Sequence, residues 1–225
     1  MSTSRRTRTP RPTAKPTLPG PYHKGNVAED LLAAVRRLIG TEGVESITVR
    51  RLCREVGVSP ANFYNHYPSI EYLLLEVAAE GAEVLLATFD RLAKRHDSRE
   101  DQLVGIAVQS VEFAVENPDL FQVMFGQVPG GPSHERYQRN IEACFGRLVR
   151  VIYGEERYRA EDAVWSYARC QKAYAFFAFN YGLARLISMG FLRFPNDARS
   201  KRQQFVREQA QQFIRGLDLA ATPEP

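Results

Sequence analysis

The sequence predicts an all-α protein in which a small N-terminal helix-turn-helix domain precedes a larger helical bundle, and two copies form a dimer. Apolar residues recur at intervals of three and four along most of the 225-residue chain, the spacing of one face of a helix. Neither the alternation with a period of two that predicts strands nor a hairpin turn occurs. Hydrophobic residues make up 44% and charged residues 25% of the chain, as in a globular protein that buries a sizeable core.

Residues 1–22 form an N-terminal segment rich in Thr, Pro and Arg, and prolines at positions 10, 12, 16, 19 and 21 exclude a helix there. Residues 1–28 hold six basic side chains and no acidic one, whereas the rest of the chain holds 24 basic and 26 acidic groups. We expect a disordered basic arm. Two interpretations stay open, a solubilising tail or an arm that binds DNA phosphates or the minor groove through Arg5, Arg6, Arg8 and Arg11.

The segment Thr48 to Tyr67 predicts two short helices joined by a tight turn. Apolar residues at helical spacing define a first helix that Thr48 caps and Gly57 ends. Ser59 and Pro60 then start a second helix, to His66, which is too short to be stable unless its one apolar side chain packs on neighbours. With a preceding helix from Asn26 to Gly43, these two predict a three-helix DNA-binding domain over residues 23–69, braced by a long helix over residues 70–95.

The run GVSPANFYNHYPSIEYLL resembles the recognition-helix signature of the tetracycline-repressor (TetR) family of bacterial regulators, and the similarity extends back to about Lys24. The bare helix-Gly-helix pattern also occurs in proteins that do not bind DNA. The family usually has a phosphate-binding Lys where this chain has Ile70, so part of the phosphate contact is expected to move to the basic arm. The resemblance implies DNA contacts from Thr48, Ser59, Pro60, Ala61, Asn62, Tyr64, Asn65 and His66.

Residues 96–225 predict the ligand-binding and dimerisation domain. A helix from Ser98 to Glu116 has two apolar faces and should lie centrally, and Asn117-Pro118 starts a short helix after it. Further helices are expected over 133–153, 159–189 and 197–219, with apolar faces left over on the last two for a dimer interface. The segments NPDLFQVMFG and YGLARLISMG resemble a TetR class that usually carries Trp-x-x-x-His-Gly, where this chain has Phe177-x-x-x-Tyr181-Gly182.

The aromatic residues of this half have two interpretations, a plain core or subunit interface, or the wall of a cavity for an apolar or aromatic ligand. Gln171, Arg169 and Arg185 are the polar groups expected to anchor such a ligand. The expected wall residues are Phe113, Phe121, Met124, Phe125, Tyr174, Phe177, Phe179 and Tyr181.

Catalytic, cofactor and metal sites are not expected. The four histidines are scattered, and neither a nucleophile elbow nor a dinucleotide fingerprint occurs. The three cysteines have no metal-ligand spacing and are expected to be small buried hydrophobes. Since no apolar run approaches the roughly 18 residues of a membrane span and no secretory signal is present, the expected location is the cytoplasm.

A recognition helix this short buries too little surface for one copy to bind DNA tightly, so two copies about 34–36 Å apart are expected on a palindromic operator. The expected function is a homodimeric repressor that a small, largely apolar or aromatic ligand releases from DNA. The first alternative is a non-inducible or architectural DNA-binding dimer whose bundle only dimerises. An enzyme is the remote alternative.

Overall fold

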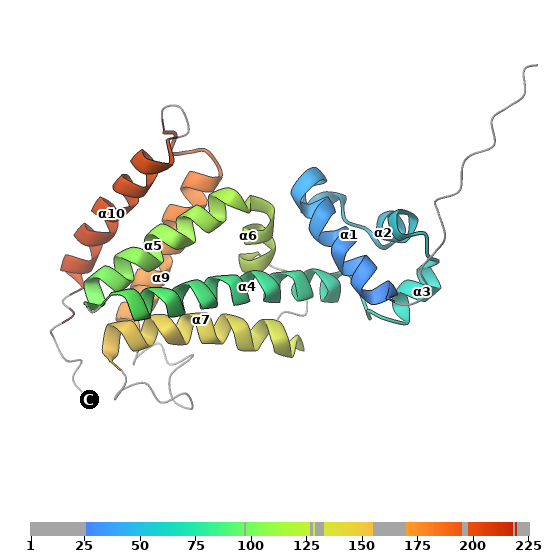
Figure 1. Ribbon diagram of the computed structural model, residues 1–225, viewed down its shortest axis with the longest axis horizontal. Coiled ribbons are helices and arrows are strands. Elements are labelled where there is room, and N and C mark those ends of the chain that lie inside the picture. Colours follow the sequence, from blue (N-terminus) through green and yellow to red (C-terminus); the bar gives the residue numbers. More distant parts are fainter. Residues whose placement is uncertain are drawn as a thin grey trace, which may run out of the picture.

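The computed structural model describes residues 26–96, 98–126, 128, 133–154, 170–194, 198–217 and 219. Within these ranges the chain forms α-helices and one short 3-10 helix and contains no strand, which confirms the all-α prediction (Figure 1). The basic arm, with Arg5, Arg6, Arg8 and Arg11, lies outside the described residues, as does Arg169.

The N-terminal domain, called the head below, consists of α1 (Val27–Glu42), η1 (Val44–Ser46), α2 (Val49–Val56) and α3 (Pro60–Tyr64). The long helix α4 (Ile70–Arg95) runs from the head into the bundle (Figure 1). Two contacts join α1 to this region: the Tyr67 hydroxyl donates to the Ala28 carbonyl at 3.0 Å, and Arg36 donates to both carboxylate oxygens of Glu80. These contacts attach α1 to α4 and to the segment just before it.

In the bundle, α5 (Arg99–Glu116), α6 (Pro118–Phe125) and α7 (Glu135–Tyr153) pack against α4. The last two helices, α9 (Gln171–Ser188) and α10 (Arg199–Gly216), pack against α5. Helix α5 contacts α4, α6, α7, α9 and α10, and nearly every residue from Leu103 to Val111 is buried. The two apolar faces of α5 therefore predicted its central position correctly.

One predicted element was wrong in extent. The expected single helix over 159–189 is described only from Gln171, and Cys170 before it has non-helical backbone angles (φ −120°, ψ 25°). The backbone amide of Lys172 in the first turn of α9 donates to the Tyr153 hydroxyl at 3.0 Å. A side chain of α7 thus satisfies this helix terminus, a long-range contact that apolar periodicity cannot reveal.

Helix α10 is one of the two helices expected to form a dimer interface. Its apolar stripe is largely used inside the subunit, because Val206, Ala210 and Ile214 are buried and Phe213 stacks on Phe179 at 4.3 Å. Several large exposed apolar side chains lie near the end of α9, including Leu186 at 45%.

Candidate DNA-binding surface and ligand cavity

Local hydrogen bonds set the angle between α2 and α3. The hydroxyl of Thr48 caps α2 by accepting from the Arg51 amide at 3.1 Å. Gly57 takes a left-handed conformation (φ 79°, ψ 28°), which brings its amide and that of Val58 each to 2.9 Å from the Cys53 carbonyl. Ser59 then caps α3 by accepting from the Asn62 amide at 3.2 Å.

Helix α3 presents polar groups to solvent because one face is anchored. Phe63 is fully buried, and its ring lies edge-on to Tyr64, whose side chain is 58% exposed. The predicted DNA-binding residues lie on α3, at its ends and at the start of α2. All of them are exposed to solvent except Asn62, which is half-buried. They are Thr48, Ser59, Pro60, Ala61, Asn62, Tyr64, Asn65 and His66.

Two basic residues of α2 extend this surface and were not singled out from the sequence. Arg50 and Arg54 are exposed one turn apart, and neither forms an ion pair with another described residue. Arg51 between them pairs instead with Glu42 at 2.8 Å and with Glu55 at 2.5 Å. The periodicity of α2 already placed positions 50 and 54 together on an outer face, so this signal was available.

Ile70 stands at the position where the TetR family usually has a lysine. Ile70 is half-buried and packs against the hydrophobic core at the first residue of α4. The hydroxyl of Ser69 caps the helix by accepting from the Tyr72 amide at 3.1 Å. The side chain at position 70 therefore contributes packing and no positive charge.

A cavity of about 140 Å³ lies among α4, α5, α6, α7 and α9. Five residues predicted for a ligand site line it: Phe121, Phe125, Tyr174, Phe177 and Tyr181. Ten further lining residues were not predicted: Leu85, Phe89, Ile106, Ser110, Ile141, Cys144, Phe145, Leu148, Asn180 and Ala184.

The remaining predicted ligand residues do not line the cavity. Met124 is fully buried between helices, and its Sδ would lie 2.5 Å from a Cβ atom added to Gly81. Phe113 and Arg185 are half-buried elsewhere, and Gln171 is exposed at the start of α9. Phe179, also considered as a wall residue, faces α10.

The cavity wall is uncharged. Burial raises the pKa of the Cys144 thiol to about 12, so it stays neutral, and its sulfur lies 3.4 Å from the Ala82 carbonyl oxygen. Burial also raises the pKa of Tyr174. The amide of Asn180 is 8% exposed, and its Oδ1 has no hydrogen-bond donor among the described residues.

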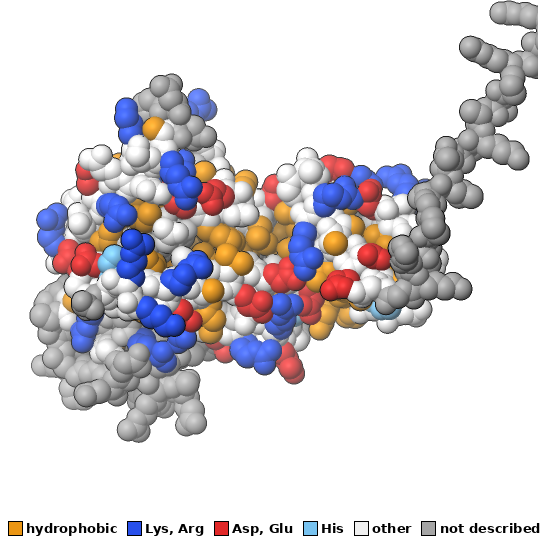
Figure 2. Space-filling model, in the orientation of Figure 1, with side chains coloured by type: hydrophobic (Ala, Val, Ile, Leu, Met, Phe, Trp, Pro, Cys, Tyr) orange, Lys and Arg blue, Asp and Glu red, His pale blue; other side chains and the backbone are white. Residues whose placement is uncertain are grey.

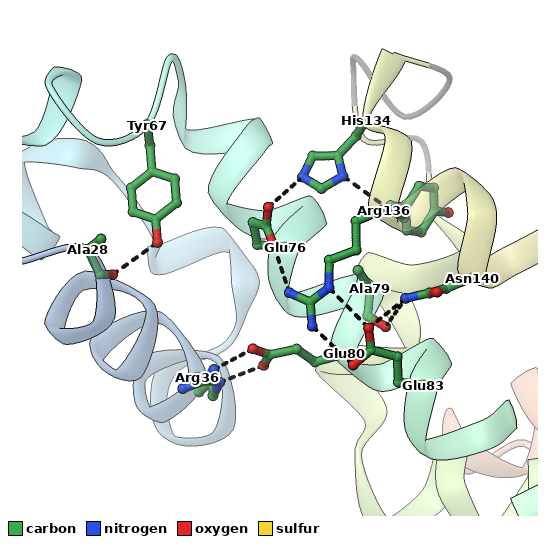
Figure 3. Close-up of polar contacts among 11 residues, drawn as sticks. Ala28, Arg36, Tyr67, Glu76, Ala79, Glu80, Glu83, His134, Arg136 and Asn140 are labelled. Carbon is green, nitrogen blue, oxygen red and sulfur yellow. Dashed lines mark hydrogen bonds and ion pairs between the residues drawn. The ribbon is translucent and has the colours of Figure 1, made fainter. Parts of the chain in front are cut away.

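A polar network joins α7, which forms part of the cavity wall, to α4 next to the head (Figure 3). Arg136 donates to Glu76 at 2.8 Å and to Glu83 at 3.0 Å, and these contacts raise its pKa. Asn140 donates to the Ala79 carbonyl at 3.2 Å, and Nε2 of the buried His134 lies 3.3 Å from Glu76. The two helices are therefore linked along the length that separates the cavity from the head.

A groove also separates the head from the bundle. Figure 2 shows hydrophobic side chains in the hollow between the two parts. Its lining comes from both parts and includes Ile39 of α1, Leu120 of α6, and Val77 and Val84 of α4. The head and the bundle thus meet at a groove lined by both apolar and charged side chains.

The residues that the structure describes contain neither a metal-binding cluster nor a membrane-spanning helix. Nowhere in these ranges do three or more His, Cys, Asp or Glu side chains come close enough to bind a metal ion. The described helices also include none that is long and apolar enough to cross a membrane.

Comparison with known proteins identifies the family. The family of bacterial regulatory proteins called tetR matches residues 31–77. The nucleoid occlusion factor SlmA of Vibrio campbellii is 31% identical over 143 residues, which cover 60% of this chain and 71% of SlmA.

Solved structures share the whole fold. A protein of unknown function from Rhodococcus sp. RHA1 is 26% identical with a TM-score of 0.67, over 88% of this chain and 98% of its own. RolR in complex with its ligand resorcinol is 16% identical with a TM-score of 0.56, over 88% and 95% of the two chains. The chain belongs to the tetR family of bacterial regulatory proteins, and it is a DNA-binding transcriptional regulator rather than an enzyme.

Proposed function

We propose that the protein is a homodimeric repressor that a small apolar or aromatic ligand releases from a palindromic operator. The observation that carries this proposal is a ring-sized cavity whose wall includes α4, the same helix that braces the head. Bacterial DNA lies in the cytoplasm, so this function places the protein there. The proposed domains are the arm at 1–22, the DNA-binding domain at 23–69 with its brace at 70–95, and the regulatory domain at 96–225.

In the proposed DNA complex, α3 enters the major groove. Pro60, Ala61, Asn62, Asn65 and His66 would face base edges, because amide and imidazole groups can pair with bases there. Thr48, Ser59 and Tyr64 would contact phosphates from either side of the groove. Arg50 and Arg54 of α2 add charge for the same backbone.

Helices α4 and α6 would carry the ligand signal. Phe121 and Phe125 of α6 line the cavity, while Met124 between them packs against Gly81 of α4. A ligand that pushes on the two aromatic rings would therefore shift α6 against α4 and against the head, which α6 contacts through α1 and η1. The resulting loss of DNA affinity cannot exceed the ligand's preference for the shifted state.

The proposed dimer interface centres on α9. Leu186 and Met189 are exposed by 45% and 54%, and Phe191 just after the helix is exposed by 73%. A cluster of large apolar side chains on the surface typically marks an interaction site. Pairing α9 across a two-fold axis would bury these residues and place two heads on one operator.

The rival function is a DNA-binding dimer without an effector. It is favoured by the similarity to SlmA, whose name describes a role at the nucleoid. The cavity favours the ligand-responsive function, because a bundle that only dimerises needs no such space. The structure of RolR, which has a similar fold, contains the aromatic ligand resorcinol and favours the same function. DNA affinity that no metabolite changes would favour the rival.

The proposed function is tested with DNA from beside the protein's own gene. We expect sequence-specific binding in a gel-shift or anisotropy assay with excess competitor DNA, with two chains per site. Binding to all fragments with equal affinity would contradict a regulator of that gene. Extracts of small apolar metabolites, added to the preformed complex, should then release the DNA.

The basic arm has its own test. Deleting residues 1–22 removes Arg5, Arg6, Arg8, Arg11 and one lysine, so we expect weaker binding and a smaller salt dependence. Each lost phosphate contact should lower the slope of log affinity against log salt by about 0.9. The measurement is DNA affinity from 50 to 200 mM salt. An unchanged slope would show that the arm is a solubilising tail and that it does not replace the lysine missing at Ile70.

A further inference from the structure

One polar group of the cavity is not satisfied by the protein. Asn180 of α9 lines the cavity with 8% of its surface exposed, and no donor among the described residues lies within hydrogen-bonding distance of its Oδ1. Buried polar groups in proteins are hydrogen-bonded in about nine cases out of ten. An amide oxygen kept in an apolar wall without a donor is therefore a candidate for ligand recognition.

The surroundings of Asn180 restrict the charge of the ligand. None of the described residues that line the cavity carries a formal charge, and the Cys144 thiol is neutral because burial raises its pKa. Ser110 of α5 supplies another small polar group, and it is 7% exposed. A charged ligand would lose its hydration here without gaining a counter-charge, so the ligand should be neutral.

The size and wall of the cavity restrict its shape. A volume of about 140 Å³ is close to the roughly 150 Å³ of an engineered apolar cavity that accepts benzene. The rings of Phe121 and Tyr181 are stacked 5.8 Å apart, and that of Phe125 lies 5.8 Å from the Tyr181 ring. Aromatic side chains of this kind favour contact with another ring, and the space holds only one.

We infer that the cavity binds a neutral phenol, a compound with a single aromatic ring whose hydroxyl group hydrogen-bonds with Asn180. This inference rests on the proposed function, since it specifies the effector of the same cavity. A hydroxyl group suits an amide especially well, because it donates to the carbonyl oxygen and can also accept from the amide nitrogen. A ring without a donor fills the same space but leaves Oδ1 buried and unpaired.

The first test uses the wild-type chain with three probes, phenol, anisole and toluene. They share one ring, but only phenol has a hydrogen-bond donor, while anisole retains the oxygen as an acceptor. Titration calorimetry on the full chain should give a Kd for phenol at least tenfold below that for anisole. Anisole and phenol bound within twofold of one another would overturn the inference without any variant.

The second test compares two substitutions on the same helix. Asn180→Leu keeps the approximate volume and removes the amide, so the ratio of the toluene Kd to the phenol Kd should fall at least tenfold. Gln171→Leu makes the same kind of change at the exposed start of α9, outside the cavity, and should leave the ratio unchanged. Thermal unfolding of both variants checks that the fold is retained.

The outcomes separate this inference from the proposed function. If phenol and toluene bind with the same ratio to wild type and Asn180→Leu, the donor requirement is wrong but the cavity still binds ligands. If no probe binds at millimolar concentration, the phenol inference is overturned. The effect of a filled cavity on DNA binding is measured without a ligand, through the Ala184→Leu variant considered below, so ligand control can survive either result.

Discussion

Replacing Glu112 with Ala should destabilise the protein by about 3–5 kcal/mol, because it removes one partner of a buried ion pair. Glu112 of α5 is 2% exposed and accepts from Arg202 of α10 at 2.8 and 2.9 Å. Arg202 is 5% exposed, and Arg199 pairs with the same carboxylate at 2.9 Å. The measurement is urea unfolding at a fixed protein concentration, since association contributes to apparent stability.

A neighbouring residue supplies the matched control for this substitution. Glu116 lies one turn further along α5, is 53% exposed and pairs with Arg199 at 3.3 Å. Glu116→Ala should cost less than about 1 kcal/mol, because solvent screens an exposed ion pair. Equal losses for the two variants would show that burial of the Glu112 carboxylate is not what makes the contact between α5 and α10 strong.

Replacing Asn62 and Asn65 together with Ala should abolish specific recognition of the operator. A good polar contact with a base contributes about 1–3 kcal/mol of discrimination, so the pair should cost roughly 2–6 kcal/mol of specific affinity. Non-specific affinity should change much less, since most of it comes from cationic side chains. Anisotropy titrations on operator and scrambled DNA give both values. Specific binding at the wild-type level would mean that α3 does not read the DNA.

Arg50→Ala is the contrasting variant in the same assay. Its guanidinium is exposed on α2 and has no ion pair among the described residues, so it should contact a phosphate rather than a base. We expect similar losses on operator and scrambled DNA and a salt slope smaller by about 0.9. A loss confined to the operator would instead assign Arg50 to base recognition.

Much of the DNA-binding domain could be predicted from the sequence because its signals are local. Thr48, Gly57 and Ser59 each act within four residues of their own position, and the structure shows the caps and the turn expected from them. The exposure of the α3 residues follows from a single buried side chain, Phe63. These features depend on backbone geometry that short segments specify by themselves.

The cavity was predicted only in part because it depends on contacts between five helices. Aromatic residues such as Phe121 and Tyr181 could be predicted to line the cavity from their residue type alone, because large rings often form the walls of ligand sites. Asn180 was missed because a single Asn in an aromatic helix carries no periodic signal, whereas Gln171 was chosen from its polarity and proves to be exposed at the helix start. Which side chain faces a cavity depends on how each helix is rotated in the bundle.

Occupancy of the cavity should lower the affinity of the head for DNA if the protein is a ligand-responsive repressor. Ala184→Leu tests it directly, because Ala184 lines the cavity at 1% exposure and a leucine there would occupy part of the space that a ligand takes. Ala87→Leu, on the exposed face of α4, controls for added apolar bulk. Operator affinity should fall about 5- to 150-fold for Ala184→Leu and stay unchanged for Ala87→Leu. A folded Ala184→Leu protein that binds the operator as tightly as wild type would contradict the claim.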